Sequence, residues 1–354
     1  MKTIRAWLEE RFDFEPIVLF MAKKKVPAGP GWYWYYMGGV ALFLFVVQVL
    51  SGILLLMYYK ASASEAFESI QFIMSKVKFG WLIRSVHSWS ANLMILAAFI
   101  HMFSVFFDRS YRKPRELTWV SGVILLLLGF GFGFSGYLLP WNELAFFATK
   151  VGTEIVGAIP VVGKGIMTVL RGSPDVTGAT LPRFFGFHVA IFPGIFVVFL
   201  GIHLALIQIQ GMSTPHNWEK LPEQKRKFMP FFPSFVLRDI LLWLIVLNVL
   251  AILAVFFPWE LGSKADLFAS APANIRPEWY FMFMFQTLKF IPGHVWFIEG
   301  EVLGILGFMI GGLIWLLVPF LDRKDDVRRY RRLKIIGSII ILYILIMTVW
   351  GYLV

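Results

Sequence analysis

Cysteine is absent from this chain of 354 residues. Without a thiolate, the protein cannot itself hold a cysteine-ligated iron–sulfur cluster, and it cannot attach haem through thioether bonds. Any centre of either kind that works with this protein must therefore belong to a partner.

Charged side chains are scarce, at 16% of the sequence, whereas hydrophobic residues make up 58% and the mean hydropathy is +0.72. This composition excludes a soluble globular domain. The first 30 residues lack the compact apolar core of a cleavable signal peptide, so membrane insertion is expected to rely on the first apolar span.

Long apolar runs dominate the rest of the chain and predict an all-α integral membrane bundle. Each run is long enough to cross a hydrocarbon core of about 30 Å as a helix. Seven spans are expected: Tyr33–Tyr58, Trp81–Phe107, Leu117–Leu139, Phe184–Gln210, Val236–Pro258, Val302–Phe320 and Lys334–Leu353. Residues Thr3–Phe20 mix apolar and charged side chains, which predicts an interfacial amphipathic helix before the first span.

The net charge of +11 is distributed unevenly along the seven expected spans. About two thirds of the Lys and Arg residues fall on the side that holds the N-terminus. The positive-inside rule therefore places the N-terminus in the cytoplasm (the n side) and the C-terminus outside (the p side) of a cell membrane. The basic excess is explained by topology and lipid contact rather than by nucleic-acid binding.

Four histidines lie within two of the expected spans. His87 and His101 are fourteen residues apart, which places both imidazoles on nearly one helix face, about 21 Å apart along the axis. His188 and His203 are fifteen apart, and Pro193 between them is expected to kink the helix and absorb the difference in register. Because both spans run from the p side to the n side, His87 pairs in depth with His188, and His101 with His203.

Two matched histidine pairs at two depths indicate two haems, each held by two imidazoles, stacked across the membrane. A single histidine within a membrane would more often be an interhelical hydrogen-bond donor. The pairing favours iron, with His87 and His188 as ligands near the p side and His101 and His203 as ligands near the n side.

Glycines repeat the same spacing on the first and third spans. Gly38 and Gly52 are fourteen residues apart, as are Gly122 and Gly136. Missing side chains at two depths would let flat macrocycles press against the helix backbone. Ordinary close packing of helices through small residues is the alternative.

Arg84 lies one turn before His87, near the p side. A guanidinium there is well placed to pair with a haem propionate, because it binds carboxylates through two hydrogen bonds. The alternative is an arginine that snorkels to the membrane surface.

Five motifs resemble the cytochrome b family of quinol-oxidising respiratory and photosynthetic complexes. They are GWLIRSVHSWS, KPRELTWVSGV (Lys113–Val123), SGYLLPW (Ser135–Trp141), TLPRFFGFH (Thr180–His188) and PEWY (Pro277–Tyr280). The fifteen-residue histidine spacing, KPRELTW and the seven spans resemble the cytochrome b6 branch, in which the haem chain and subunit IV are separate proteins.

In this sequence the two parts form one chain. We expect a dihaem, four-helix, b6-like domain over residues 1–212, an n-side linker over 213–232, and a three-helix, subunit IV-like domain over 233–354 that completes the quinone pockets. The linker is polar and rich in proline, as expected of a domain boundary.

The resemblance also implies a p-side quinol-oxidation site. Its residues would be Pro277, Glu278, Trp279 and Tyr280 of PEWY, together with Tyr137 at the end of the third span. Glu278 would accept a proton from quinol through a carboxylate whose pKa is raised by apolar surroundings. Without the resemblance, a glutamate after proline would be interpreted as a charge that stabilises a helix N-terminus.

On the n side the resemblance points to two further residues and one departure. Asp239 is a candidate for protonating quinone, with a charged membrane anchor as the alternative. Arg115 is a candidate partner for a propionate of the n-side haem. Tyr36 replaces the cysteine that carries an additional haem in the b6 branch, so no covalent haem is expected there.

The function that the resemblance implies is bifurcated quinol oxidation at the p side. Electrons would pass through two non-covalent b-type haems to quinone at the n side, coupled to proton translocation. The implied partners are a Rieske-type iron–sulfur protein, a c-type cytochrome, lipid and a second copy of the complex, with no nucleic acid.

Two other classes of function are less consistent with the sequence. A dihaem membrane anchor of a dehydrogenase or hydrogenase would not need PEWY, and a transporter with histidine proton relays would leave the glycine pairs without a role. His216 and His294 fall in loops and are assigned no ligand role.

Overall fold

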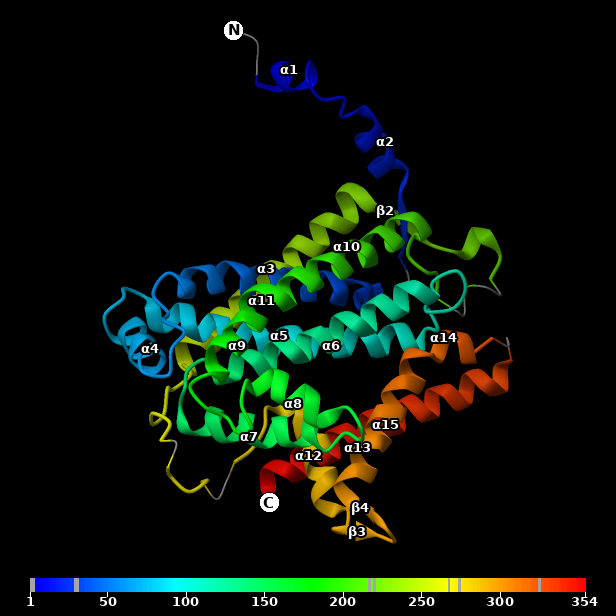
Figure 1. The fold of residues 1–354 in the computed structure, drawn as a ribbon. Helices are drawn as coiled ribbons and strands as arrows, with labels where there is room; N and C mark the ends of the chain where they lie inside the picture. Colours follow the sequence, from blue (N-terminus) through cyan, green and yellow to red (C-terminus); the bar gives the residue numbers. More distant parts are fainter. Residues whose placement is uncertain are drawn as a thin grey trace.

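The computed structural model describes residues 4–28, 32–215, 218, 221–266, 268–272, 275–323 and 326–354. Its first bundle contains four long apolar helices (Figure 1). They are α3 (Met37–Leu56), α5 (Gly80–Phe107), α6 (Glu116–Leu138) and α10 (Phe192–Gln210). Helix α3 packs along α5, α10 packs along α6, and α5 contacts α6. The all-α membrane fold is confirmed, and these spans begin and end close to their predicted bounds.

Three apolar helices form the C-terminal part: α11 (Val236–Phe256), α13 (Gly300–Leu316) and α15 (Val327–Leu353). Helix α11 packs on α3 and α5, and α15 contacts α5. Among the described residues, six helical segments are long and apolar enough to cross a membrane, whereas α13 is a shorter apolar helix. It ends before Leu317, and α14 (Val318–Leu321) follows. The predicted count of seven spans is therefore not confirmed.

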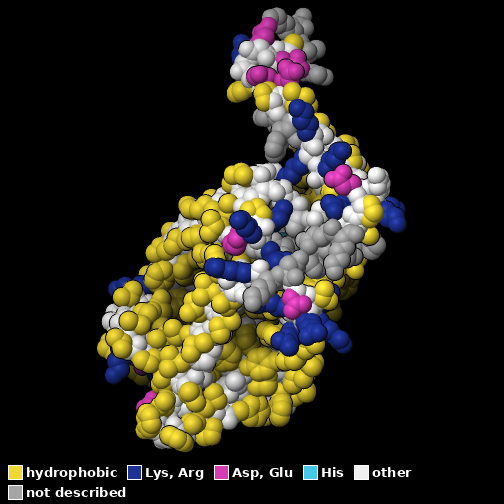
Figure 2. All heavy atoms as spheres, turned by 90° about the vertical axis from the view of Figure 1, so that its right-hand side faces the viewer, with side chains coloured by type: hydrophobic (Ala, Val, Ile, Leu, Met, Phe, Trp, Pro, Cys, Tyr) yellow, Lys and Arg dark blue, Asp and Glu magenta, His cyan; other side chains and the backbone are white. Residues whose placement is uncertain are grey.

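The flanks of the bundle are apolar and one end is basic. In Figure 2 the molecule is turned so that the right-hand end of Figure 1 faces the viewer. Hydrophobic side chains (yellow) cover the flanks, and Lys and Arg side chains (dark blue) gather at this end. Outward-facing Ile245 and Ile339 remain about 60% and 59% exposed, as expected of residues that face lipid. The basic end carries the loop between α5 and α6 and the segment after α10, which the charge distribution assigns to the n side.

The N-terminal segment projects from the bundle (Figure 1). The helix predicted over Thr3–Phe20 is divided into α1 (Ile4–Glu9) and α2 (Glu15–Lys23). Pro16 explains the division, since it lacks the N–H that a continuous helix would need but suits the first turn of a new one.

Short elements connect the segment after α10 to the bundle. After α2, β1 (Lys25–Pro27) pairs antiparallel with β2 (Phe228–Pro230), so the N-terminal segment is tied to the end of the predicted linker. The 3-10 helices η1 (Trp32–Tyr36) and η4 (Glu223–Lys225) precede α3 and β2, and the π-helical η5 (Phe231–Phe235) leads into α11.

The fourth span contains a π-helical turn. Helix α9 (Thr180–Gly186) continues into η2 (Phe187–Ile191) and then α10. The N–H of Phe192 donates to the carbonyl of Phe187, five residues back, so one extra residue is accommodated directly after His188. The register difference between the two histidine pairs is therefore absorbed by this turn, which directly precedes Pro193 in the first turn of α10.

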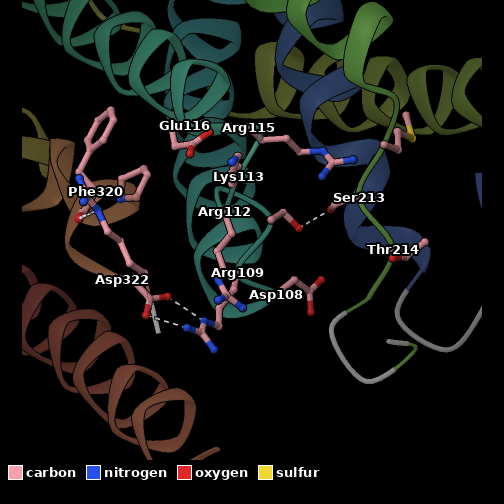
Figure 3. Close-up of a pocket in the computed structure, with 14 residues that line it drawn as sticks. Asp108, Arg109, Arg112, Lys113, Arg115, Glu116, Ser213, Thr214, Phe320 and Asp322 are labelled. Atoms are coloured by element: carbon pink, nitrogen blue, oxygen red, sulfur yellow. Dashed lines mark hydrogen bonds and ion pairs between the residues drawn. The ribbon is translucent and has the colours of Figure 1, made fainter. Parts of the chain in front are cut away.

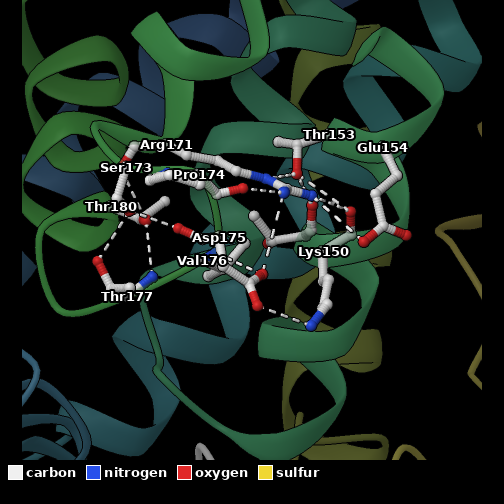
Figure 4. A network of polar contacts seen from close by, with 11 residues as sticks. Lys150, Thr153, Glu154, Arg171, Ser173, Pro174, Asp175, Val176, Thr177 and Thr180 are labelled. Carbon is white, nitrogen blue, oxygen red and sulfur yellow. Dashed lines mark hydrogen bonds and ion pairs between the residues drawn. The ribbon is translucent and has the colours of Figure 1, made fainter. Parts of the chain in front are cut away.

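The p-side segments contain three shorter helices, α4 (Ala66–Ser75), α7 (Glu143–Gly157) and α8 (Gly163–Arg171). Arg171 fixes α8 to α7 through a buried network shown in Figure 4. Its Nε donates to Thr153 Oγ1 at 2.7 Å, and its Nη2 and Nη1 donate to the carbonyls of Lys150 and Pro174 at 2.9 and 3.0 Å. Helix α12 (Trp279–Phe290) packs on α15, and the hairpin of β3 (His294–Val295) and β4 (Ile298–Glu299) follows it.

A buried ion pair joins the two parts of the chain on the n side. The Arg109 guanidinium, after α5, donates from Nε and Nη2 to the Asp322 carboxylate at 2.8 and 2.6 Å, and Tyr111 donates to the same carboxylate at 2.9 Å. Arg329 on α15 adds a contact at 3.0 Å. Although the run from Asp322 to Lys334 is highly charged and its composition alone would predict a solvated loop, Asp322 is buried and α15 begins at Val327.

Replacing Asp322 by alanine is expected to lower the free energy of unfolding by about 3–5 kcal/mol, because the buried Arg109 charge would lose its carboxylate. Thermal unfolding of the purified protein in detergent measures this. Glu65→Ala is the matched control, since it breaks the exposed Lys60–Glu65 pair, whose loss should change little. Equal losses in the two variants would contradict the role of the buried pair.

Candidate functional site

The p-side histidines lie ring to ring between two helices of the first bundle. His87 is on α5 and His188 is in η2, and their ring centroids are 6.3 Å apart with an interplanar angle of 73°. Two metal–nitrogen bonds of about 2.0 Å, usual for imidazole ligands, would account for about 4 Å of that distance. The half-widths of the two rings account for the rest, so the separation fits one iron between the imidazoles.

The n-side histidines, His101 on α5 and His203 on α10, belong to the same two helical segments at the other depth. They are close enough to interact electrostatically. The structure therefore brings together the two pairs that the sequence pattern predicts.

A glycine lies behind each of the four imidazoles. A Cβ atom built on Gly52 or Gly136 would lie 3.3 or 2.6 Å from Cε1 of the p-side rings, and one on Gly38 or Gly122 would lie 3.1 or 3.2 Å from Cε1 of the n-side rings. All four distances are tighter than ordinary van der Waals contacts. The predicted glycines thus make room for the histidine rings themselves, which lets each ring stand between the helices and aim at its partner.

Arg84 is buried, at 8% exposure, in the p-side half of α5. Its Nη1 donates to the carbonyl of Trp259 at 2.6 Å, and its Nη2 to that of Glu260 at 3.3 Å. The side chain therefore does not snorkel to the surface, and it anchors the segment after α11 to the level of His87.

Arg115 lines an n-side cavity of about 730 Å³ between the loop after α5, the segment after α10 and the end of α14. Figure 3 shows Arg109, Arg112 and Lys113 at the same cavity. Among the described residues, the hydrogen bonds of Arg115 are long, 3.3 and 3.4 Å, and run to the carbonyls of Gln210 and Gly211 at the end of the helix that carries His203. Its guanidinium could exchange these contacts for those to an acidic group.

Glu278 is the N-cap of α12 rather than a residue of its first turn, and its side chain makes no capping hydrogen bond. Burial raises the pKa of its carboxyl to about 7. This acid therefore changes protonation state near neutral pH, which a proton acceptor requires.

Aromatic contacts fix the rest of the PEWY segment. Tyr280 stacks on Phe130 of α6 with ring centroids 5.8 Å apart and an interplanar angle of 5°, and its hydroxyl reaches the backbone beside Gly133. Trp279 Nε1 donates to Asn92 Oδ1 at 2.8 Å. The segment that follows Pro277 is thus attached to α5, the helix that carries two of the histidines.

Three tyrosines from different elements interact electrostatically with Glu278: Tyr280, Tyr137 at the end of α6, and Tyr352 at the end of α15. Burial and the nearby Glu278 raise the pKa of Tyr280 well above its ordinary value, so its hydroxyl remains protonated. Tyr352 was missed by the sequence reasoning. It belongs to no motif, and only the packing of α15 on α12 brings it here.

Asp239 opens α11 on the n side, next to the start of α3. A Cβ on Gly39 would lie 2.6 Å from both of its carboxylate oxygens, and its Oδ1 is buried without a hydrogen-bond partner among the described residues. Tyr36 stacks on Phe235 one turn away, with ring centroids 4.4 Å apart. Within the described residues, Asp239 Oδ1 therefore remains available as a hydrogen-bond acceptor.

Two loop histidines had been assigned no ligand role. His294 is exposed in the hairpin after α12. His216 lies outside the described residues.

Comparison with known families agrees with both parts of the chain. Residues 23–211 match the family model described as cytochrome b/b6/petB, and residues 264–354 match the model described as cytochrome b (C-terminal)/b6/petD.

Individual proteins with similar sequences and folds cover nearly the whole chain. The cytochrome bc complex cytochrome b subunit of Chlorobaculum thiosulfatiphilum is 49% identical over 347 residues, which is 98% of this chain and 80% of that protein. A chain from a solved structure of a hyperthermophilic respiratory complex III superposes with a TM-score of 0.87 at 31% identity, over 99% of this chain and 91% of that one.

Proposed function

The chain belongs to the cytochrome b/b6 family, and from this membership we propose that it is the cytochrome b subunit of a quinol-oxidising, bc-type complex. The observation that supports this most directly is the pair of histidine rings 6.3 Å apart on α5 and η2, with a second pair on the same helices at the other depth. The proposed location is the cell membrane, with the N-terminus in the cytoplasm and the C-terminus outside.

The four histidines would hold two non-covalent b-type haems, His87 with His188 near the p side and His101 with His203 near the n side. Bound there, the haems supply one-electron carriers at two depths, so that one quinol electron reaches the n side while the other leaves on the p side. The glycines behind the rings leave room for the imidazoles. Arg84 and Arg115 would pair with propionates in exchange for their contacts to backbone carbonyls.

Quinol would be oxidised at the p face, where Glu278, Tyr280, Tyr137 and Tyr352 meet. Glu278 accepts a proton from a quinol hydroxyl and releases it to the p side. Tyr280 and Tyr137 keep their hydroxyl protons and hydrogen-bond the quinol oxygen. Pro277 and Trp279 flank the carboxylate in sequence, and the bond from Trp279 to Asn92 holds this segment against α5.

Quinone would be reduced at the n face, where Asp239 supplies protons that come from the cytoplasm. Moving one electron inward across the whole membrane works against the membrane potential, at a cost of about 2.3 kcal/mol per 100 mV. Releasing protons on the p side and taking them up on the n side conserves the energy of quinol oxidation as a proton gradient.

The electron that leaves on the p side needs an acceptor that this cysteine-free chain does not contain. We therefore propose a Rieske-type iron–sulfur protein and a c-type cytochrome as partner subunits. A homodimer of the complex is proposed on family membership alone.

The pH dependence of quinol oxidation tests the role of Glu278. Because only the carboxylate accepts a proton, and its pKa is about 7, the rate should be about half-maximal at pH 7 and fall about tenfold for each unit below pH 6. Stopped-flow reduction of the haem spectrum by a quinol analogue measures it. A rate that stays constant between pH 5.5 and 8, or that rises as the pH falls, would contradict the role.

We also propose that the chain consists of a dihaem domain over residues 1–212, a linker over 213–232, and a quinol-site domain over 233–354. The Arg109–Asp322 pair joins the two domains. A chain cleaved at a protease site inserted in the linker should stay associated, whereas the same cleavage in the Asp322→Ala variant should release the C-terminal part more readily. If the two parts separate after cleavage even when Asp322 is present, the Arg109–Asp322 pair does not hold the two domains together, and this account of their connection is wrong.

A further inference from the structure

Three of the four candidate haem ligands share a second contact. Ser51 Oγ lies 2.9 Å from His87 Nδ1, Ser121 Oγ lies 2.9 Å from His203 Nδ1, and Ser135 Oγ lies 3.1 Å from His188 Nδ1. All three serines are buried, with exposures of 6% or less. Each directly precedes the glycine that stands behind the same imidazole, so the contact recurs as a Ser–Gly dipeptide.

The direction of these hydrogen bonds follows from the helix backbone. Each serine hydroxyl donates its one proton to a carbonyl of its own helix: Ser51 to Val47 at 2.6 Å, Ser121 to Thr118 at 3.0 Å, and Ser135 to Gly131 at 2.7 Å. The serine oxygen is left as an acceptor, so the proton belongs on Nδ1 of the histidine. This leaves Nε2, the other ring nitrogen, as the free iron donor.

The fourth histidine lacks this contact. His101 faces Gly38, which follows Met37 rather than a serine. Its Nδ1 is buried and has no hydrogen-bond partner among the described residues. Ser104, one turn along α5, donates to the backbone carbonyl of His101 at 2.7 Å and does not supply the missing bond.

We propose that Ser51, Ser121 and Ser135 are positioning residues that fix the tautomer and tune the donor strength of their histidines, and that His101 is left as the weaker donor. The proposal rests on the proposed haem ligation. An acceptor at Nδ1–H makes an imidazole more basic, and a more basic ligand favours ferric over ferrous iron, which lowers the reduction potential. The p-side site has two such bonds and the n-side site has one, so the reduction potential of the p-side haem should be lowered more. An electron shared between the two haems would therefore favour the n-side haem.

Substitutions of single residues can separate this effect from folding. In purified protein, Ser51→Ala and Ser135→Ala should each raise the midpoint potential of the p-side haem, and Ser121→Ala that of the n-side haem. We expect about a tenfold change in the ferric-to-ferrous equilibrium for each, which corresponds to about 59 mV for one electron. Ser51→Thr, which keeps the hydroxyl, should restore the original potential.

Met37→Ser tests the same idea in the opposite direction. By supplying an acceptor to His101 Nδ1, it should lower the n-side potential and narrow the gap between the two haems. Ser104→Ala is the matched control, because this serine touches the same residue through its carbonyl and not through its ring.

Redox titration of the visible spectrum of each variant decides between the outcomes. Shifts confined to the haem whose ligand loses or gains the hydroxyl would support the proposal. The proposal would be overturned if both haems are present but their midpoint potentials do not change in the Ser51, Ser121 and Ser135 variants. It would also be overturned if Ser104→Ala shifts the midpoint potential as much as those variants do. Either result would leave the proposed function intact. A purified chain that binds no haem would instead refute the proposed function.

Discussion

Glu278→Gln is expected to slow quinol oxidation by about 10²- to 10⁴-fold, the usual loss when a general base is removed. Glutamine keeps the size and polarity of the side chain but cannot accept a proton at any pH near neutrality. Since Glu278 caps α12 without a side-chain hydrogen bond, the helix should form unchanged, and the haem spectrum should stay intact. Stopped-flow reduction by a quinol analogue, together with the oxidised spectrum, gives both readings.

A matched control for this variant is Glu260→Gln, which changes an exposed carboxylate on the same side of the membrane. It should leave the rate of quinol oxidation unchanged. The residual activity of Glu278→Gln should also lose the rise in rate through pH 7. If the variant loses haem as well as activity, Glu278 has a structural role and the assignment as proton acceptor is wrong.

His101→Leu is expected to remove one of the two haems and leave the other in place. Leucine fills a similar volume but offers no nitrogen to iron, and His203 alone is a weak site for a non-covalent haem. The p-side pair, about 21 Å away along the helix, should keep its haem and its potential. Pyridine haemochrome analysis measures the haem per polypeptide, and a redox titration shows which potential is lost.

The control for this variant is His294→Leu, because His294 is exposed in the hairpin after α12. It should retain the full haem content. Loss of both haems in His101→Leu without unfolding would mean that the sites are not independent. Retention of both would mean that His101 is not a ligand.

Hydropathy and spacing predicted the parts of the fold that depend on short-range rules. The apolar runs became α3, α5, α6, α10, α11 and α15, and the fourteen-residue spacings placed each glycine opposite a histidine. Periodicity is enough for these predictions, because residues with the same spacing on two neighbouring helices lie on one helix face and at matching depths.

Features that depend on tertiary packing were not predictable in the same way. Pro193 signals an irregularity in the fourth span, but the sequence does not reveal that it takes the form of a π-helical turn around His188. Asp322 looked solvated because it stands in a highly charged run, yet its bond to Arg109 spans more than 200 residues of sequence. Tyr352 reaches Glu278 only because α15 packs on α12.

The serine contacts lay in the sequence as three Ser–Gly dipeptides, but their meaning depends on the positions of the rings. Only the distances from Ser51, Ser121 and Ser135 to Nδ1 atoms distinguish them from ordinary small residues in helix packing. The histidine pairs were therefore predictable from the sequence, whereas the serine contacts at their Nδ1 atoms were visible only in the structure.

The most direct test of the central claim is a redox-titrated visible difference spectrum of the purified chain, with a haem count per polypeptide. The account predicts two b-type haems with separate midpoint potentials. A chain that carries no haem would contradict it, and a transporter with histidines in its membrane spans would then explain the sequence better.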